Sequence, residues 1–272
     1  DFPIPAVGPV IKALITGPTA GIGKSIAYQL AEKGYDLFLV ARREDRLQNL
    51  KSDIENKFQV RVHYLKSDLA SPDAPQEIYD YGKSMNLDIS TLILNAGYQI
   101  NTKLEEATLQ EEEDCLRVLG LSVIMQSKLY IKDLMSRGGG HIMVVSSMAG
   151  FSPPSTEFAI LYGPVKTFMN RFVEALNGAY NKNNIYSTAL CPGFTVTEFH
   201  TMSGTQDRMD KVPSFMKLSA DQVAQEGIDG MFKNKETVIP GNLNRFLISV
   251  LRFFPTGAIK WIGNKIAGGR YK

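Results

Sequence analysis

The stretch Thr16-Gly17-Pro18-Thr19-Ala20-Gly21-Ile22-Gly23 lies between an apolar run, Val10–Thr16, and a helical pattern, Lys24–Lys33. A glycine-rich turn in this position lets the chain turn tightly, lets its backbone approach a pyrophosphate, and lets helix and strand pack closely. The N-terminus of the following helix then offers free N–H groups and the positive end of its dipole to an anion. We therefore expect a dinucleotide-binding turn; the alternative is a glycine-rich turn that binds no ligand. The residues expected to contact the cofactor here are Gly17, Thr19, Gly21, Ile22 and Gly23.

The rest of the chain alternates short β-rich runs with helical patterns. Most of the runs are almost continuously apolar, as is typical of strands covered on both faces. Gly34 closes the first helical pattern as a C-cap. The alternation predicts an α/β fold, a single doubly wound (Rossmann-type) domain over residues 1–272, with a parallel sheet and helices on both faces. After the first strand, the expected strands are Tyr35–Val40, Val60–Lys66, Thr91–Leu94, His141–Ser147, Ile185–Cys191 and Val238–Ile239.

Size, composition and charge restrict the functional class. A chain of 272 residues with 44% hydrophobic residues suits one domain with a sizeable core. Its net charge of +2 gives no reason to expect a nucleic-acid partner. Cys115 and Cys191 lack metal-ligand spacing, so we expect no metal site and a reduced, cytoplasmic setting. No apolar run reaches the ~20 residues of a membrane span. The chain begins at Asp1 rather than Met, which leaves open the removal of an upstream segment.

The second expected strand ends in Val40-Ala41-Arg42-Arg43, with no acidic residue before Glu44. An acidic residue at this point would bind the hydroxyls of an adenosine ribose and repel a 2′-phosphate, whereas a guanidinium pairs with the phosphate. The sequence therefore predicts NADP(H) as cofactor, with Arg42 as the main selector and Arg43 as a helper. The alternative is a pair of solvated surface arginines.

A tyrosine followed four residues later by a lysine occurs at Tyr162 and Lys166. Hydride transfer to a carbonyl needs a proton donor, and a tyrosine serves if a nearby cation lowers its pKa from ~10. Residues four apart share one face of a helix, and Pro164 fits the first turn of such a helix. The same spacing occurs at Tyr79 and Lys83, within the expected helix between the third and fourth strands. We expect the first pair, which follows the fifth strand, to be catalytic.

The glycines at 17, 21 and 23 are spaced G-x-x-x-G-x-G, ahead of the Tyr-x-x-x-Lys pair. With Asn95-Ala96-Gly97 after the fourth strand and Ser146-Ser147 at the end of the fifth, the order of motifs resembles the short-chain dehydrogenase/reductase family, in its NADP-dependent reductase form. The resemblance covers roughly residues 10–245. It implies that Tyr162 and Lys166 contact the cofactor as well as moving protons.

The resemblance also assigns cofactor contacts at the ends of the third and fourth strands. It implies that Asp68, followed by Leu69, contacts the adenine. Small residues in Asn95-Ala96-Gly97 would let the chain pass close to the cofactor. The Asn95 side chain could equally bridge neighbouring strands by hydrogen bonds, which is a structural role.

Further implied roles concern the nicotinamide end. Ser147 would orient the substrate carbonyl and steady Tyr162; a serine that only caps a turn is the alternative. The turn Pro192-Gly193 after the sixth strand would pack on the nicotinamide. Thr195 or Thr197 would contact the diphosphate or the carboxamide.

Two features depart from the family's pattern. The family's catalytic asparagine, which holds a water that relays protons to the lysine, falls near Leu119 when counted along that pattern, and no asparagine is present there. Ser122, about one turn away, is a candidate substitute. The gap from Ser147 to Tyr162 is about two residues longer than the family's usual spacing, so the loop Phe151–Leu161 should bulge and line a substrate pocket.

Two segments near the end of the chain have distinctive compositions. Residues 199–218 are polar, contain methionines and are weakly patterned, which indicates a substrate lid. Residues 242–272 hold basic, aromatic and aliphatic side chains and no acid. This mixture suits weak peripheral contact with an anionic membrane; cover for the substrate pocket or a subunit contact is the alternative.

These observations predict an NADP(H)-dependent oxidoreductase that interconverts a carbonyl and an alcohol on a bulky apolar small molecule. One alternative is a cofactor-binding sensor or scaffold with weakened catalysis, which only the missing asparagine supports. An epimerase or dehydratase acting on nucleotide sugars is another, although those relatives need a larger C-terminal region. The family resemblance implies a homodimer or homotetramer, paired through the helices that carry Leu116–Leu134 and Tyr162–Tyr180.

Overall fold

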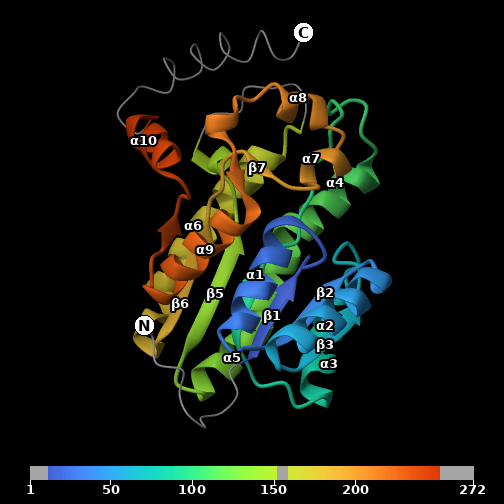
Figure 1. Cartoon of the computed structure of the whole chain (residues 1–272), viewed down its shortest axis with the longest axis vertical. Coiled ribbons are helices and arrows are strands. Elements are labelled where there is room, and N and C mark those ends of the chain that lie inside the picture. Colours follow the sequence, from blue (N-terminus) through green and yellow to red (C-terminus); the bar gives the residue numbers. More distant parts are fainter. Residues whose placement is uncertain (1–11, 152–158, 252–272) are drawn as a thin grey trace.

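A computed structural model describes residues 12–151 and 159–251 of the chain. Within these residues, parallel strands form a seven-stranded sheet in the order β3-β2-β1-β4-β5-β6-β9 (Figure 1). The sheet confirms the predicted doubly wound α/β fold. The strands are β1 Lys12–Thr16, β2 Asp36–Ala41, β3 Val62–Lys66, β4 Ile89–Leu94, β5 Gly140–Val145, β6 Ile185–Leu190 and β9 Thr237–Val238.

Helices cover both faces of the sheet. Neighbouring residues of one strand pack into different hydrophobic cores, one on each face of the sheet, because successive side chains point to opposite faces. On β1, Ile15 packs with the helices α1 and α9, while Leu14 packs with α5 and α6. Both positions must therefore be apolar, which explains the continuous runs in the sequence. One face carries α1 Gly21–Glu32, α2 Glu44–Phe58 and α9 Ala220–Phe232, and the other carries α3 Ala74–Ser84, α5 Ser122–Ser136 and α6 Tyr162–Tyr180.

The observed element boundaries differ from the predicted ones by one to three residues. The first helix begins at Gly21, inside the glycine-rich stretch, and the chain leaves it through Gly34 at a φ of 84°. The expected residues Val10 and Ile11 of the first strand lie outside the described part of the chain. The shifts do not change which strand ends carry the motifs.

The order of the strands reverses between β1 and β4. Connections from these two strands run to opposite sides, which opens a crevice at their carboxyl ends. Several short elements lie at this end of the sheet, at the top of Figure 1. They include α4 Leu109–Leu116, α7 Phe199–Met202, α8 Gln206–Asp210 and α10 Asn242–Leu251, with the paired strands β7 Thr195–Val196 and β8 Leu218–Ser219.

The expected lid, residues 199–218, is more ordered than its composition indicates. It contains α7, α8 and the 3-10 turn η4 Ser214–Met216, and the pairing of β7 with β8 joins its two ends. Other 3-10 turns are η2 Met148–Phe151 after β5 and η3 Asn181–Asn183 before β6. Of the segment 242–272, only α10 belongs to the described residues. Within the described parts, no helix is both long and apolar enough to cross a membrane.

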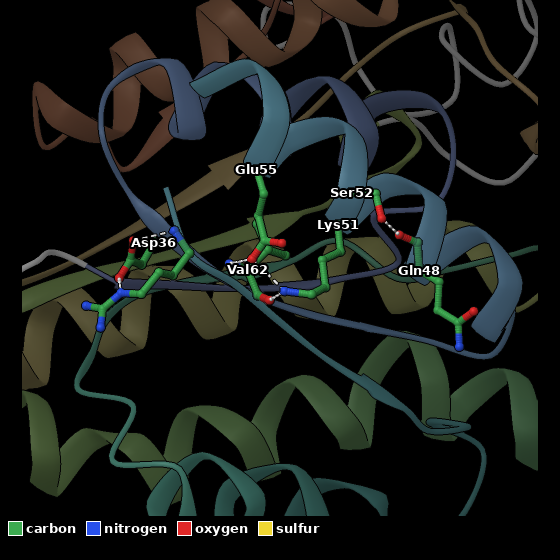
Figure 2. A network of polar contacts seen from close by, with 7 residues as sticks. Asp36, Gln48, Lys51, Ser52, Glu55 and Val62 are labelled. Carbon is green, nitrogen blue, oxygen red and sulfur yellow. Dashed lines mark hydrogen bonds and ion pairs between the residues drawn. The ribbon is translucent and has the colours of Figure 1, made fainter. Parts of the chain in front are cut away.

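Polar contacts fix α2 to the edge strand β3 (Figure 2). Lys51 Nζ donates to the Val62 carbonyl oxygen at 2.7 Å, and Glu55 Oε1 accepts from the Val62 N–H at 2.9 Å. Asp36, at the start of β2, accepts hydrogen bonds from the Arg61 backbone N–H at 2.8 Å and from its guanidinium at 2.9 Å. These contacts hold α2, the helix whose N-terminus directly follows Arg43, against β3.

Candidate active site

A cavity of about 700 Å³ lies at the carboxyl ends of the strands. It brings together every residue that the sequence assigned to cofactor binding or catalysis, except Gly23. Those residues come from the ends of β1 to β6 and from the start of α6. Gly23 lies on α1 and packs closely against Asn95. A Cβ added at Gly23 would come 2.3 Å from the Asn95 Nδ2. Its role is therefore close packing of helix on strand, one of the three uses expected of the glycines.

The glycine turn has the geometry that an anion site needs. Gly17 and Gly21 have φ values of 66° and 52°, which favour glycine. A Cβ added at Gly21 would lie 2.9 Å from Thr197, so the turn and the segment after β6 approach closely. The N-cap residue Ala20 makes no side-chain cap, and the first turn of α1 carries no acid. The first N–H groups of α1 are thus free to bind a phosphate.

Asn95 joins the ends of β1 and β4. Its Nδ2 donates to the carbonyl oxygens of Thr16 and Gly17, each at 3.0 Å, and its N–H donates to the Thr16 hydroxyl at 3.0 Å. The structure therefore bears out the strand-bridging alternative for this side chain. The bridge sets the width of the crevice where the order of the strands reverses.

The two arginines after β2 both line the cavity but have different surroundings. Arg42 is 62% exposed, and its nearest acidic group is Asp68, at 4.0 Å. Arg43 donates to the Thr19 hydroxyl at 2.9 Å and lies 3.5 Å from the Glu198 carboxylate. Arg43 is therefore tied to the glycine turn, while the ion pair of Arg42 with Asp68 is long and weak.

The two serines at the end of β5 both line the cavity but differ in their hydrogen-bond partners. Ser146 is buried and donates to the Lys166 carbonyl oxygen at 3.1 Å, a contact internal to the fold. Ser147 lines the cavity, as Tyr162 does, and its side chain is near enough to the Tyr162 hydroxyl to act on the pKa of that group. Its Oγ also accepts the Ala149 N–H at 3.1 Å, which fixes its rotamer. The second serine is thus the one that meets the tyrosine.

Lys166 lies behind Tyr162 on the first turns of α6. Its Nζ donates to the Val145 carbonyl oxygen at 2.8 Å and lies 5.5 Å from the centre of the Tyr162 ring. Burial lowers the pKa of Lys166 to about 8. Burial also raises the pKa of Tyr162 to about 12, although the bond to Ser147 acts in the opposite direction. The expectation that a cation lowers the pKa of the tyrosine is wrong in this structure, because desolvation of the phenolate dominates.

The second Tyr-x-x-x-Lys pair is far from the cavity. Tyr79 packs edge-on against Tyr130, and Lys83 donates to Asp133 at 3.2 Å. All four residues lie on α3 and α5, and none lines the cavity. Spacing alone could not separate the two pairs, but the position after β5 did.

Leu119, the first departure from the family's pattern, lies where the helix after β4 changes from α-helical to π-helical winding. Residues Arg117–Leu121 form a π-helical turn, η1, between α4 and α5. Leu119 is buried, lines the cavity and packs against Gly97. Ser122 does not fit the role of substitute: it is buried outside the cavity lining, and its hydroxyl donates to Val118 in the same helix at 2.9 Å. Of the loop Phe151–Leu161, residues 152–158 lie outside the described part, and Ala159 and Ile160 line the cavity.

The segment after β6 also lines the cavity. Thr195 donates to the Gly193 carbonyl oxygen at 3.1 Å, and the Thr197 hydroxyl accepts the Phe199 N–H at 3.2 Å. Glu198, for which no role was expected, is part of this lining. Apolar side chains line the cavity as well, among them those of the expected lid. The apolar residues are Met202, Met209 and Met216, with Met148, Phe194, Phe199 and Leu247.

Comparison with known proteins agrees with this geometry. Residues 12–208 match the family model described as short chain dehydrogenase. The chain belongs to the short-chain dehydrogenase family, as its motifs indicate.

Individual relatives are distant. A human protein named very-long-chain 3-oxoacyl-CoA reductase is 30% identical over 200 residues, or 71% of this chain and 62% of that protein. The alignment thus spans less than two thirds of that relative. A 7beta-hydroxysteroid dehydrogenase from Mediterraneibacter gnavus is 27% identical over 68% of each chain. A short-chain dehydrogenase from Sphingobium yanoikuyae, solved in complex with NADPH, superposes with a TM-score of 0.78 at 23% identity, covering 90% of this chain and 96% of that one.

Proposed function

We propose that this protein is an NADP(H)-dependent oxidoreductase that interconverts a carbonyl and an alcohol on a bulky apolar small molecule. The observation that carries the proposal is that Ser147 and Tyr162 line the same cavity, with Lys166 Nζ 5.5 Å from the centre of the tyrosine ring. Two hydroxyls that face one cavity can hold one carbonyl oxygen. A lysine beneath them can stabilise the negative charge that a proton transfer leaves on the phenol.

The residues of the chain fit the cofactor along the whole cavity. The uncapped N-terminus of α1 would hold the diphosphate, and Arg42 and Arg43 would hold the 2′-phosphate of the adenosine ribose. Asp68 and Leu69 would contact the adenine, and the turn Pro192-Gly193 would contact the nicotinamide. When bound, the cofactor would supply the hydride that reduces the carbonyl or accept the hydride that the alcohol loses.

The proton chemistry then belongs to the chain itself. A substrate carbonyl oxygen would accept hydrogen bonds from Ser147 and Tyr162. As negative charge grows on that oxygen, Tyr162 would donate its proton and the oxygen would become the alcohol hydroxyl. Burial raises the pKa of Tyr162 to about 12, so the tyrosine stays protonated before the reaction and can act as the proton donor. Lys166, within 5.5 Å of the ring centre, would stabilise the resulting phenolate.

The far wall of the cavity supports an apolar substrate. Methionine, phenylalanine and leucine side chains line it, and methionines adapt their shape to irregular ligands. The names of the relatives, a reductase of very-long-chain 3-oxoacyl-CoA and a dehydrogenase of hydroxysteroids, agree with a large apolar molecule. We therefore propose a ketone on a long acyl chain or a fused-ring skeleton as the substrate class.

A panel experiment tests this function. NADPH consumption and alcohol formation would be measured with 3-oxoacyl thioesters of increasing chain length, with oxosteroids, and with small polar ketones. We expect turnover that rises with the apolar size of the ketone.

The alternative function is a cofactor-binding sensor with weakened catalysis, and it rests on Leu119 in place of asparagine. Tight NADPH binding without turnover of any ketone would favour this alternative.

We also propose that the protein forms a homodimer through α4, α5 and α6. Exposed apolar side chains lie on these helices and on η1 between them, at Leu109, Leu116, Leu121, Met125 and Phe168. Light scattering of the wild type and of Phe168→Glu tests this, and a wild-type monomer would contradict it.

Both cysteines are buried and free, which agrees with a reduced, cytoplasmic setting.

Weak contact with an anionic membrane remains a proposal for α10 and the basic, apolar residues that follow it. Phe246 on α10 is 64% exposed, and Phe215 in the lid is 73% exposed. Arg245, next to Phe246, already pairs with Glu226 at 2.8 Å, so α10 itself offers little free charge. Co-sedimentation with anionic vesicles at low salt should capture the wild type more than Phe246→Ser. No capture of either protein would contradict the proposal.

A further inference from the structure

The carboxylate of Glu198 lies between two arginines beside the cavity. Its Oε2 accepts from Arg46 at 2.7 Å and from Arg43 at 3.5 Å. Glu198 is on the segment after β6, and Arg46 lies in the first turns of α2, so the contact joins elements far apart in the chain. The hydrogen bond with Arg46 first, and then the charge of both arginines, hold the pKa of Glu198 below its usual range. The carboxylate is therefore ionised at neutral pH.

Arg43 is the arginine on which these contacts converge. Its other terminal nitrogen donates to Thr19 in the glycine turn at 2.9 Å. This bond holds the guanidinium at the end of the cavity where the 2′-phosphate would bind. Among the described residues that line the cavity, Asp68 and Glu198 are the acids, and Asp68 faces Arg42. Each arginine at this end therefore has one acidic neighbour.

Such acidic neighbours oppose a phosphate. A 2′-phosphate beside Arg43 would place negative charge close to the Glu198 carboxylate, and like charges at this separation repel. The shorter contact of Glu198, however, is with Arg46 rather than with Arg43. Arg46 therefore neutralises the carboxylate and leaves Arg43 largely free for the phosphate.

We propose that Glu198 and Arg46 together set how strongly the cofactor's 2′-phosphate binds. Glu198 competes with the phosphate for Arg43. Arg46 weakens this competition because it binds the Glu198 carboxylate. The inference rests on the proposed use of NADP(H) and deepens it. Neither residue was expected from the sequence to select the cofactor, and Arg46 does not line the cavity. Both are specificity-determining residues in this account, since they act on the phosphate through Arg43.

Fluorescence titrations with NADPH and NADH test the pair on the full chain. Glu198→Gln should tighten NADPH binding about twofold to fivefold, the range for a partly exposed charge contact, and leave NADH binding unchanged. Arg46→Gln should weaken NADPH binding by a similar factor, because the freed carboxylate would move to Arg43. The double variant should return close to the wild type. Both effects should shrink at high salt.

Glu44→Gln is a matched control. Glu44 is a half-exposed acid on the same helix as Arg46, but it pairs with Lys66 at 3.9 Å and does not line the cavity. Its substitution should leave the ratio of the NADH and NADPH dissociation constants unchanged. Weaker NADPH binding in Glu198→Gln, or an unchanged ratio in both Glu198→Gln and Glu198→Ala, would overturn the proposal. A wild type that prefers NADH would instead refute the proposed cofactor, so the two failures are distinguishable.

Discussion

Lys166 Nζ lies 5.5 Å from the centre of the Tyr162 ring while it donates to the carbonyl oxygen of Val145, the last residue of β5. The carboxyl end of β5 therefore holds the Lys166 side chain in place by this hydrogen bond. Tyr162 lies next to Lys166 and lines the cavity. Because both side chains come from the first turns of α6, a shift of this helix would move them together. The relation explains why the tyrosine and the lysine lie four residues apart at the start of the helix that packs on the end of the fifth strand.

The pKa of Lys166 predicts how carbonyl reduction depends on pH. Burial lowers this pKa to about 8, so the lysine loses its positive charge as the pH rises through about 8. Tyr162, with a pKa of about 12, stays protonated over this range. We expect kcat/KM for reduction to be highest below pH 8 and to fall above it, since the neutral lysine no longer stabilises the phenolate. A rate of reduction that rises between pH 8 and pH 10 would contradict this assignment.

Lys166→Ala should damage both turnover and cofactor binding. The substitution removes the cation behind Tyr162 and also a contact that the family resemblance assigns to the cofactor. NADPH titration and steady-state kinetics on the same preparation separate the two effects. Lys83→Ala, in the second Tyr-x-x-x-Lys pair, is the control and should leave both unchanged, because Lys83 faces Asp133 away from the cavity.

Arg42→Ala should reduce the preference for NADPH over NADH. Loss of one hydrogen-bonded charge contact to a phosphate costs about 1.5–3 kcal/mol, which corresponds to roughly tenfold to hundredfold in the dissociation constant. NADH lacks the 2′-phosphate, so its dissociation constant should stay the same. Tighter binding of NADH than of NADPH by the unmodified protein would rule the selector role out.

Leu119→Asn should leave the rate at or above that of the wild type. If the relay that the family's asparagine supports is simply missing, restoring the amide should raise kcat or leave it unchanged. Leu119 is buried against Gly97, so the variant should unfold at a lower temperature. A large loss of rate in a variant that circular dichroism shows to be folded would mean that the leucine has acquired a role of its own.

Most of the fold and of the site could be predicted from the sequence because their signals are local. Strands such as Asp36–Ala41 are buried on both faces, which leaves an apolar run, and the glycine turn and the Tyr162–Lys166 pair are short motifs. The contact between Arg43 and Glu198 joins residues 155 positions apart and has no local signal. The π-helical turn at Arg117–Leu121 and the raised pKa of Tyr162 depend in the same way on packing that the sequence does not display.

The most direct test of the account is Tyr162→Phe, assayed with the best ketone from the panel. The phenol supplies the proton but no part of the phosphate site, so turnover should fall about 10²-fold to 10⁴-fold while the dissociation constant of NADPH stays the same. Tyr79→Phe, which removes the hydroxyl from the other pair, should keep the wild-type rate. A Tyr162→Phe protein that still reduces the ketone at the wild-type rate, or an inactive Tyr79→Phe protein, would contradict the assignment of Tyr162 as the proton donor.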